Sequence, residues 1–454
     1  MTHSIRVGNG AGFWGDNLDA PVVLARDGQL DYLTLEYLAE LTLAILSHIR
    51  MKDPGAGYVN DFPELLEQLQ PIISEQPNLK IVTNAGGLNP VACAKRCSLL
   101  AGSSVIGIVT GDDVLASLPQ WIRQGVALDH LETGESLDLS LADRFVSASV
   151  YLGAGPIAQA LNASARIVIT GRVADASLTL GPALHAFGWS MNDWNRLAGA
   201  TVAGHVIECG AQATGGLWHR WASLPSLADV GYPIAELAED GSSVITKAIG
   251  SGGTVEVGTI AEQLVYEIDD PRRYRTPDVD VDLTSLHLHQ RQHDRVEITD
   301  CRGMSPGDSL KVACVYRDGY TASGLVAVVG RNAEAKARAA GQIVLDRLKN
   351  AGYVMDASLV ECLGAGDVVP GLLRPESAPH EVVLRVTVRD PRKAAVERFC
   401  REIAPLVTAG PPGIAGYASG RPSPKPSFGY WPCLIPRSFV TPRVEVRPAQ
   451  EWKL

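Results

Sequence analysis

The amino-acid sequence predicts an α/β fold: a mostly parallel, Rossmann-like layered sheet, followed by a second α+β domain of ferredoxin-like type. Two observations lead to this prediction. Over the first half of the chain, short and almost wholly apolar runs alternate with helical patterns, which indicates βαβ units with strands buried on both faces. In the second half, strand-like runs come in pairs separated by helices, which is typical of an α+β layer.

The predicted strands of the first domain are the runs at 4–7, 31–35, 80–83, 104–109 and 166–169. Helical patterns lie between them at 18–26, 41–50, 62–73 and 90–100, and Pro90 suits the first turn of the last helix. In the second half we expect strands at 296–300, 309–316, 323–329, 359–363, 381–388 and 444–446, with helices at 333–350 and 392–407. We therefore predict an α/β ligand-binding or catalytic domain at 1–235 and an α+β domain at 236–454. A Pro- and Asp-rich segment at 269–282 would link or cover them, and a Gly/Pro-rich wrap would end the chain.

Composition excludes several classes of function. The chain has 454 residues, and its 40 Lys and Arg against 50 Asp and Glu give a formal net charge of −10, without the basic footprint that nucleic-acid binding needs. No apolar run reaches about 18 residues, so we expect no membrane span. The N-terminus lacks a signal-peptide pattern, and none of the eight Cys forms a CxxC pair or a zinc-like cluster. We expect free thiols, no metal and a cytoplasmic location.

Polar and glycine residues follow the ends of all five predicted strands. Because ligands of open α/β sheets bind beyond the carboxyl ends of the strands, these residues are the candidate site. The catalytic candidates are Asp112, Glu40, Asn84, Arg172 and Asp175, joined from a later helix end by Glu208 and Cys209. The substrate-binding candidates are Gly10, Gly12, Asp16, Gly86, Gly87, Asn89, Thr110, Gly111, Thr170 and Gly171.

Each candidate has a proposed chemistry and a structural alternative. Arg172 can hold a carboxylate in two hydrogen bonds and Asp175 can orient it, but the two can equally form an internal ion pair. Asn84 can polarise a carbonyl, or can pack in a turn. Asp112 or Glu40 can serve as a general base.

The glycine-rich loop GNGAGFWGD at 8–16 allows close approach of an anion to the backbone, or forms a tight turn with Asp16 as a helix N-cap. Its G-x-G-x-x-G spacing is weak evidence for a nicotinamide cofactor, which we do not predict. Glu208 and Cys209 lie near His205 in HVIECGAQATGG, where a thiol site or a buried helix end are both possible.

An ordered set of motifs resembles the acyclic terpene utilisation family. The set includes GNGAGFWGD, NAGGLNP, VITGRVADASL, ECGAQATGG, GTVEVGTIAEQLVYEI and LVTAGPPGIAGY, and it spans nearly the whole chain. The resemblance implies catabolism of branched terpenoid acids through CoA thioesters, by a hydratase or a lyase. It also implies that this chain, which stops at Leu454, lacks an extra C-terminal ferredoxin-like domain of longer members. The resemblance assigns no catalytic residue.

The sequence therefore predicts a catabolic hydratase or lyase that acts on a small carboxylate or acyl-CoA thioester. Coenzyme A would enter as part of the substrate, and no other cofactor is predicted. One alternative is a hydrolase or amidase of a non-thioester substrate, with Cys209 as nucleophile or a carboxylate-bound metal. Another is a non-catalytic ligand-binding subunit that works with a small ferredoxin-like partner. We expect a homo-oligomer.

Overall fold

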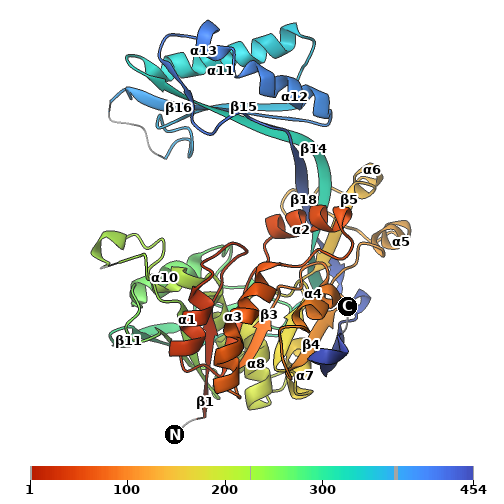
Figure 1. Ribbon diagram of the computed structural model, residues 1–454. Helices are drawn as coiled ribbons and strands as arrows, with labels where there is room; N and C mark the ends of the chain where they lie inside the picture. The colour runs from red at the N-terminus through yellow and green to blue at the C-terminus, as the bar shows by residue number, and fades with distance from the viewer. Residues whose placement is uncertain (1–2, 225, 373–376, 453–454) are drawn as a thin grey trace. The chain divides into compact units, whose positions relative to one another are not determined.

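The computed structural model describes residues 3–224, 226–372 and 377–452, and the chain forms two compact units (Figure 1). Unit 1 comprises Met1–Val315 and Tyr430–Leu454, and unit 2 comprises Tyr316–Gly429. The boundary that the sequence predicts at 235/236 falls inside unit 1, within strand β7 (Pro233–Ala238). Segments 236–315 and 430–454 belong to unit 1 because their strands extend its sheets.

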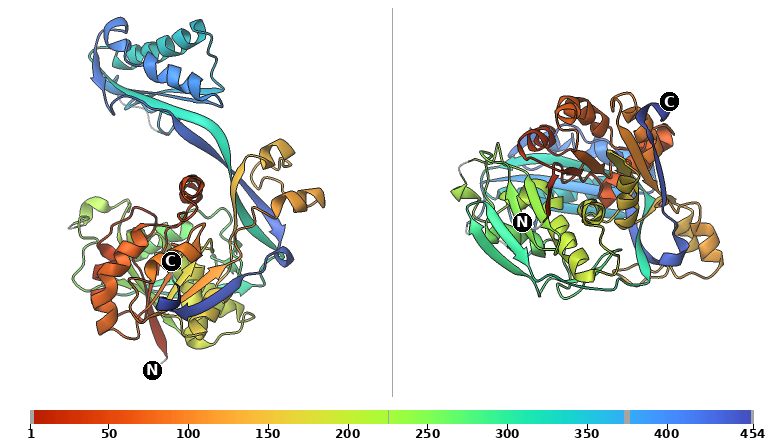
Figure 2. Two further views of the ribbon diagram at one scale, coloured as in Figure 1. Left: turned by 45° about the vertical axis from the view of Figure 1, so that its right-hand side comes forward. Right: turned by 90° about the horizontal axis from the view of Figure 1, so that it is seen from below.

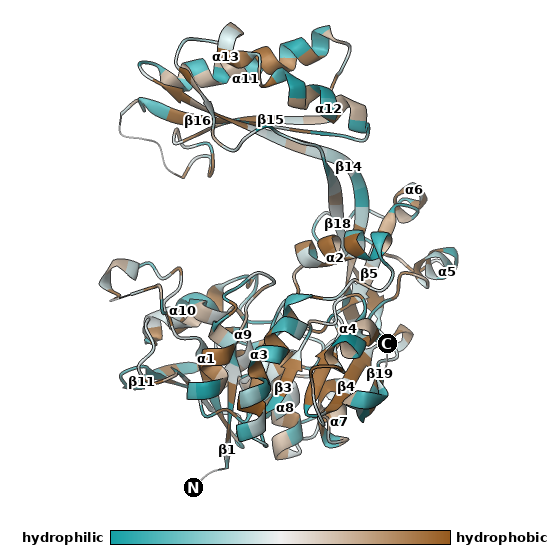
Figure 3. Cartoon of the chain, in the orientation of Figure 1, coloured by the Kyte–Doolittle hydropathy of each residue, from teal (hydrophilic) through white to brown (hydrophobic). Residues whose placement is uncertain are grey.

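Five parallel strands form the centre of a ten-stranded sheet in unit 1. In spatial order they are β1 (Ser4–Asn9), β2 (Tyr32–Leu35), β3 (Lys80–Thr83), β6 (Ile167–Thr170) and β4 (Val105–Thr110). All residues of β2 and β6 are buried, which their uninterrupted apolar runs predict, and Figure 3 shows the same apolar character in β3 and β4. These are the five strands predicted for the first domain.

Five further strands pair antiparallel, so the prediction of a mostly parallel sheet is wrong for the sheet as a whole. On one side of β1 the order is β7, β8 (Ser243–Lys247), β12 (Arg295–Thr299) and β11 (His287–Gln292). At the other edge β19 (Arg443–Pro448) pairs with β4, and Figure 2 shows this dark-blue strand at the edge of the sheet. Short turns join β7 to β8 and β11 to β12, and such hairpins require antiparallel strands.

Helices cover both faces of this sheet, which the right-hand view of Figure 2 shows. On one face, α1 (Ala20–Asp27), α3 (Asp61–Glu75) and α4 (Pro90–Cys97) pack in a row. On the other, α7 (Gly155–Asn162), α8 (Ser177–Phe187) and α9 (Trp194–Glu208) do the same. The other helices of unit 1 are α2 (Glu40–Lys52), α5 (Leu118–Arg123), α6 (Leu139–Ala142) and α10 (Val257–Val265).

The segment predicted as a linker at 269–282 is instead part of unit 1. It contains β9 (Tyr274–Arg275) and β10 (Asp280–Asp282), which form a three-stranded sheet with β13 (Arg302–Met304). Strand β5 (Phe145–Val150), which the sequence analysis missed, pairs with β14 (Ser309–Val329).

Unit 2 follows the order strand, helix, strand, strand, two helices, strand. Its elements are the later part of β14, α11 (Ala333–Asn350), β15 (Ala357–Leu363), β16 (Glu381–Asp390), α12 (Lys393–Glu402), α13 (Leu406–Ala409) and β17 (Ile414–Tyr417). The sheet order is β15-β16-β14-β17, with antiparallel pairing throughout. The alternation in β16 buries Val382, Leu384, Val386 and Val388 in the core with α11 and α12. The assignment of this unit to the ferredoxin-like class stays a prediction.

Strand β18 (Lys425–Pro436) pairs with β14, and both strands contribute residues to each unit. No helix in the described part of the chain is long and apolar enough to cross a membrane.

Candidate functional site

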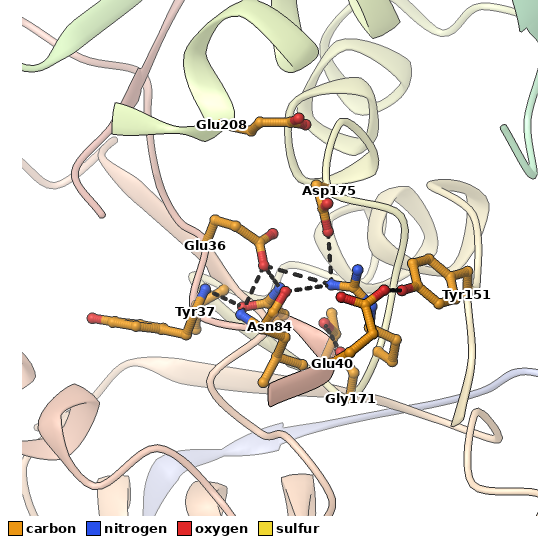
Figure 4. A network of polar contacts seen from close by, with 12 residues as sticks. Glu36, Tyr37, Glu40, Asn84, Tyr151, Gly171, Asp175 and Glu208 are labelled. Atoms are coloured by element: carbon orange, nitrogen blue, oxygen red, sulfur yellow. Dashed lines mark hydrogen bonds and ion pairs between the residues drawn. The ribbon is translucent and has the colours of Figure 1, made fainter. Parts of the chain in front are cut away.

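The ends of the central parallel strands bring the predicted polar side chains together (Figure 4). Glu36 follows β2, Asn84 follows β3, Asp112 follows β4, and Arg172 and Asp175 follow β6. Glu40 begins α2 directly after this edge. The predicted convergence is therefore observed for the catalytic candidates of the strand ends. Their contacts decide which of them can meet a ligand.

Arg172 is an internal cation rather than a ligand-binding one. Its side chain is 3% exposed, and Nη1 donates to the carbonyl of Leu38 at 2.8 Å and to Oδ1 of Asp175 at 2.7 Å. The guanidinium also lies 4.0 Å from the ring centre of Tyr151. Burial alone would lower the pKa of Arg172, but the carboxylates around it, first Asp175, raise the pKa well above its usual value. The predicted role of holding the substrate anion is not supported, because the guanidinium is buried and its partners are groups of the protein itself. The alternative, an internal ion pair with Asp175, is observed.

One carboxylate oxygen of Glu40 accepts from three donors. Oε1 accepts from the hydroxyl of Tyr151 at 2.6 Å, from that of Tyr430 at 3.2 Å and from Nζ of Lys311 at 3.5 Å. Burial would raise the pKa of Glu40, but the Tyr151 hydrogen bond and the charges of Arg172 and Lys311 lower it to about 2. A carboxylate this weakly basic is a poor general base at neutral pH, so the structure does not favour that role.

Asp112 joins the ends of β4 and β6. Its Oδ2 accepts the backbone N–H of Arg172 at 2.8 Å, and burial raises its pKa to about 7 even though that hydrogen bond lowers it. The carboxyl group rests against Gly171, where an added Cβ would lie 2.3 Å from Oδ2. Asp112 lines neither of the two cavities that adjoin this network. Its position therefore suits a structural clamp better than a base that meets substrate.

Gly171→Ala is expected to destabilise unit 1 by about 1–3 kcal/mol, because the new methyl group displaces the buried Asp112 carboxyl. Urea unfolding followed by tryptophan fluorescence measures this change. Gly155→Ala is the matched control, since nothing lies within 4 Å of an added Cβ there, and its effect should stay within about 0.5 kcal/mol. Equal stability of the two variants would contradict the clamp.

Asn84 and the loop glycines also serve the fold. The Asn84 amide is fully buried; it donates to Glu36 and accepts the backbone N–H of Tyr37 at 2.8 Å, so it cannot polarise a substrate carbonyl. Asn89 caps α4 by accepting from the N–H of Ala92 at 3.2 Å. The other predicted binding residues away from the cavities meet backbone or apolar atoms of the chain: Gly10, Gly86, Gly87, Thr110, Gly111 and Thr170.

Two cavities adjoin beside this network. The first, of about 440 Å³, is lined by residues that include Tyr151, His205, Tyr274 and Lys311. The second, of about 530 Å³, is lined by Gly12, Asp16 and Glu36 among others. Both share Asp175, Glu208 and Glu267 as wall residues, so these three acids lie between the two spaces. Of the predicted site residues, the cavity walls contain Gly12, Asp16, Asp175, Glu208 and Cys209.

Glu208 ends α9 and forms a buried pair with His205, whose Nδ1 lies 3.0 Å from Oε1. The other carboxyl oxygen of Glu208 and Nε2 of His205 are buried and have no partner. Burial raises the pKa of Glu208 to about 7 against the opposing effect of His205, whose own pKa is raised by Glu208 despite its burial. This pair can therefore gain or lose a proton near neutral pH on the wall of both cavities.

The loop at 12–16 and the end of α9 meet directly. An added Cβ at Gly12 would lie 2.7 Å from the carbonyl carbon of Cys209, so only glycine allows this approach. Asp16 is no helix cap, since α1 begins later, after Asp19; its Oδ2 accepts the N–H of Gly12 at 2.8 Å. Burial and then Glu208 raise the pKa of Cys209 to about 12, which disfavours it as a nucleophile.

The sequence analysis missed Tyr151, Lys311 and Glu267 as cavity residues. Tyr151 follows β5, and the alternating run FVSASV before it is the signal that could have found it. Lys311 comes from β14, and Glu267 from a position with φ of +60°, a backbone conformation that the sequence does not reveal.

A comparison with protein-family models decides the family. The model described as acyclic terpene utilisation family protein AtuA matches residues 5–446, nearly the whole chain. This chain belongs to that family. The family's name points to acyclic terpene utilisation, which is a catabolic role. No curated protein and no solved structure matches this family member. In the described residues, no group of three or more His, Cys, Asp and Glu side chains is placed to hold a metal ion.

Proposed function

We propose that this family member is a hydratase or lyase that acts on a small carboxylate or acyl-CoA thioester. The observation that carries the proposal is the pair of acids on the shared wall of the two cavities. Asp175 is fixed by the guanidinium of Arg172, whereas Glu208 has a pKa raised to about 7. Two acids in different environments can divide the roles of base and acid.

In the hydration direction, Asp175 accepts a proton from water while the water oxygen bonds to the β-carbon of an unsaturated acyl group. Neutral Glu208 donates a proton to the α-carbon, so that one water is added in all, and exchange with solvent restores both groups. A lyase reaction uses the same base to take a proton from a β-hydroxyl group, which becomes a carbonyl group as the carbon–carbon bond breaks. Neutral Glu208 then gives a proton to the α-carbon that the broken bond releases, and exchange with solvent restores both acids. His205 supports the transfer by its hydrogen bond to Glu208.

Asp175→Asn and Glu208→Gln are expected to lower kcat by about 10²–10⁴-fold, because each removes one proton-transfer group. The measurement is hydration, dehydration and cleavage of a panel of α,β-unsaturated and β-hydroxy acyl-CoA thioesters. Glu239→Gln, an exposed acid outside the cavities, is the control and should keep the wild-type rate.

Wild-type rates in both site variants would refute the assignment of these acids. Absence of any turnover by the wild-type protein across the panel would refute the hydratase or lyase and leave the non-catalytic binding subunit. The alternative hydrolase that uses Cys209 is disfavoured by the raised pKa of that thiol.

A further inference from the structure

The second cavity, which we call the acid-floored cavity, has an apolar side and an acidic side. Phe13, Leu217 and Tyr266 line it while being 55%, 85% and 40% exposed, so they form its rim towards solvent. Glu36 lines it while buried, so it lies at the floor. An apolar rim over a polar floor suits a ligand with a hydrocarbon part and one polar group.

The charge of the lining limits what that polar group can be. The acids on the wall are Asp16, Glu36, Asp175, Glu208 and Glu267, and no Lys, Arg or His is among the described residues that line it. A carboxylate or phosphate in this space would face carboxylates without a counter-charge on the lining, which is unfavourable at low dielectric. The polar group of the ligand is therefore not an anion.

Glu36 has one saturated oxygen and one without a partner. Its Oε1 accepts the N–H of Leu38 at 2.9 Å and a hydrogen bond from Asn84, and it lies 3.7 Å from Nη1 of Arg172. Its Oε2 is buried and has no partner, and Figure 4 shows it on the side of the carboxyl group that faces away from Asn84. A buried polar atom without a partner is rare in a folded protein and calls for a ligand or water.

The arrangement of donors places the proton of Glu36. Burial and then the charge of Asp175 raise the pKa of Glu36 well above its usual value, although Arg172 and Asn84 oppose this. Since all the donors meet Oε1, a neutral Glu36 carries its proton on Oε2, where the hydroxyl becomes a hydrogen-bond donor. Carboxylic acids kept neutral by burial are known to donate to substrate oxygens in this way.

We propose that the acid-floored cavity binds the uncharged carbonyl group of an apolar acyl chain, with Oε2 of Glu36 donating a hydrogen bond to the carbonyl oxygen. The chain then extends along Leu38 towards Phe13 and Leu217. Two wall residues, Leu217 and Glu267, have φ of +59° and +60°, and such strained non-glycine backbone gathers at functional sites. The inference rests on the proposed function for the class of substrate, and it adds that the acyl group enters as a thioester or another neutral carbonyl rather than as a free acid.

Calorimetric titration of the full chain with 2-octanone and with octanoate tests this binding without turnover. The wild-type protein should bind 2-octanone at least tenfold more tightly than octanoate at pH 7, and should lose 2-octanone as the pH rises and Glu36 ionises. Glu36→Gln should still bind the ketone, because its amide N–H donates in place of the hydroxyl, and should do so with much less dependence on pH. Glu36→Leu should bind about tenfold more weakly, having lost the donor.

The charged groups that face Glu36 are Arg172 and Asp175, and Asp16, Glu208 and Glu267 share its cavity. These groups are unchanged in Glu36→Gln, so the difference between its pH profile and that of the wild type isolates Glu36. Phe13→Ala, at the exposed rim, tests the apolar part with little risk to folding and should weaken ketone binding several-fold with the wild-type pH profile.

Equal affinity for octanoate and 2-octanone, or the same loss with pH in Glu36→Gln and in the wild type, would overturn the proposal. The outcome is separate from that of the activity test. Ketone binding with no thioester turnover would refute the proposed function and leave the carbonyl site. Thioester turnover without ketone binding that depends on Glu36 would refute the carbonyl site and leave the proposed function.

Discussion

Arg172→Met is expected to lower the free energy of unfolding of unit 1 by about 3–5 kcal/mol, one of the two largest effects that we foresee. The substitution keeps the length and stacking of the side chain but removes the cation that pairs with the partly buried Asp175 carboxylate and lies beside the Glu36 carboxyl group. Asp175 loses its 2.7 Å ion pair, and Glu36 loses a guanidinium at 3.7 Å. The carbonyl of Leu38 also loses a donor.

Urea unfolding followed by tryptophan fluorescence measures this loss in unit 1 alone, because all eight Trp lie outside 316–429. Arg26→Met is the matched control: Arg26 pairs with Asp27 at the surface, where solvent screens the two charges, so its loss should leave stability nearly unchanged. Arg172→Lys should fall between wild type and Met, because it keeps the charge and loses the planar donor group. If Arg172→Met were as stable as Arg26→Met, the Arg172 guanidinium would not be needed to stabilise the neighbouring acids Asp175 and Glu36.

Asp112→Asn is expected to change how the stability of unit 1 depends on pH. The carboxyl of Asp112 titrates at a pKa of about 7 in the folded chain, against its ordinary value of 3.8. Between these values the folded state holds a proton that the unfolded state has released, so the contribution of Asp112 to stability falls as pH rises from about 4 to 7. Below that window the contribution is complete, and above it a constant deficit of about 4 kcal/mol remains.

The Asn variant lacks this titration but keeps an oxygen that can accept the N–H of Arg172. Its stability relative to wild type should therefore rise by about 3 kcal/mol between pH 4.5 and 7.5, measured by urea unfolding at several pH values. Glu36 and Glu208 also have raised pKa values, but they remain in both proteins and cancel in the difference. Glu239→Gln, exposed and remote, controls for the loss of one negative charge. A difference between Asn variant and wild type that does not vary with pH would contradict the prediction.

The centre of the sheet and the meeting of its strand ends could be predicted from the sequence. Buried parallel strands are nearly all apolar, and the side chains that follow them must gather at one edge, so Asn84, Asp112 and Arg172 were found together. The antiparallel strands could not be placed in the same way. Nothing local in β7 or β19 tells which edge of which sheet they join, and the pairing of β19 with β4 links residues more than 300 positions apart.

The sequence by itself determined the central parallel strands, the polar residues at their ends and the resemblance that the family match confirmed. Only the tertiary structure decided which of those polar side chains are bonded to other groups of the protein and which line a cavity. Arg172 and Asn84 are bonded to groups of the protein itself: Leu38, Asp175, Glu36 and Tyr37. Glu208, from a helix more than 100 residues beyond β3, lines a cavity instead. The reason is physical: burial and partner groups set the protonation and the free hydrogen-bonding capacity of a side chain, and both come from segments distant in sequence.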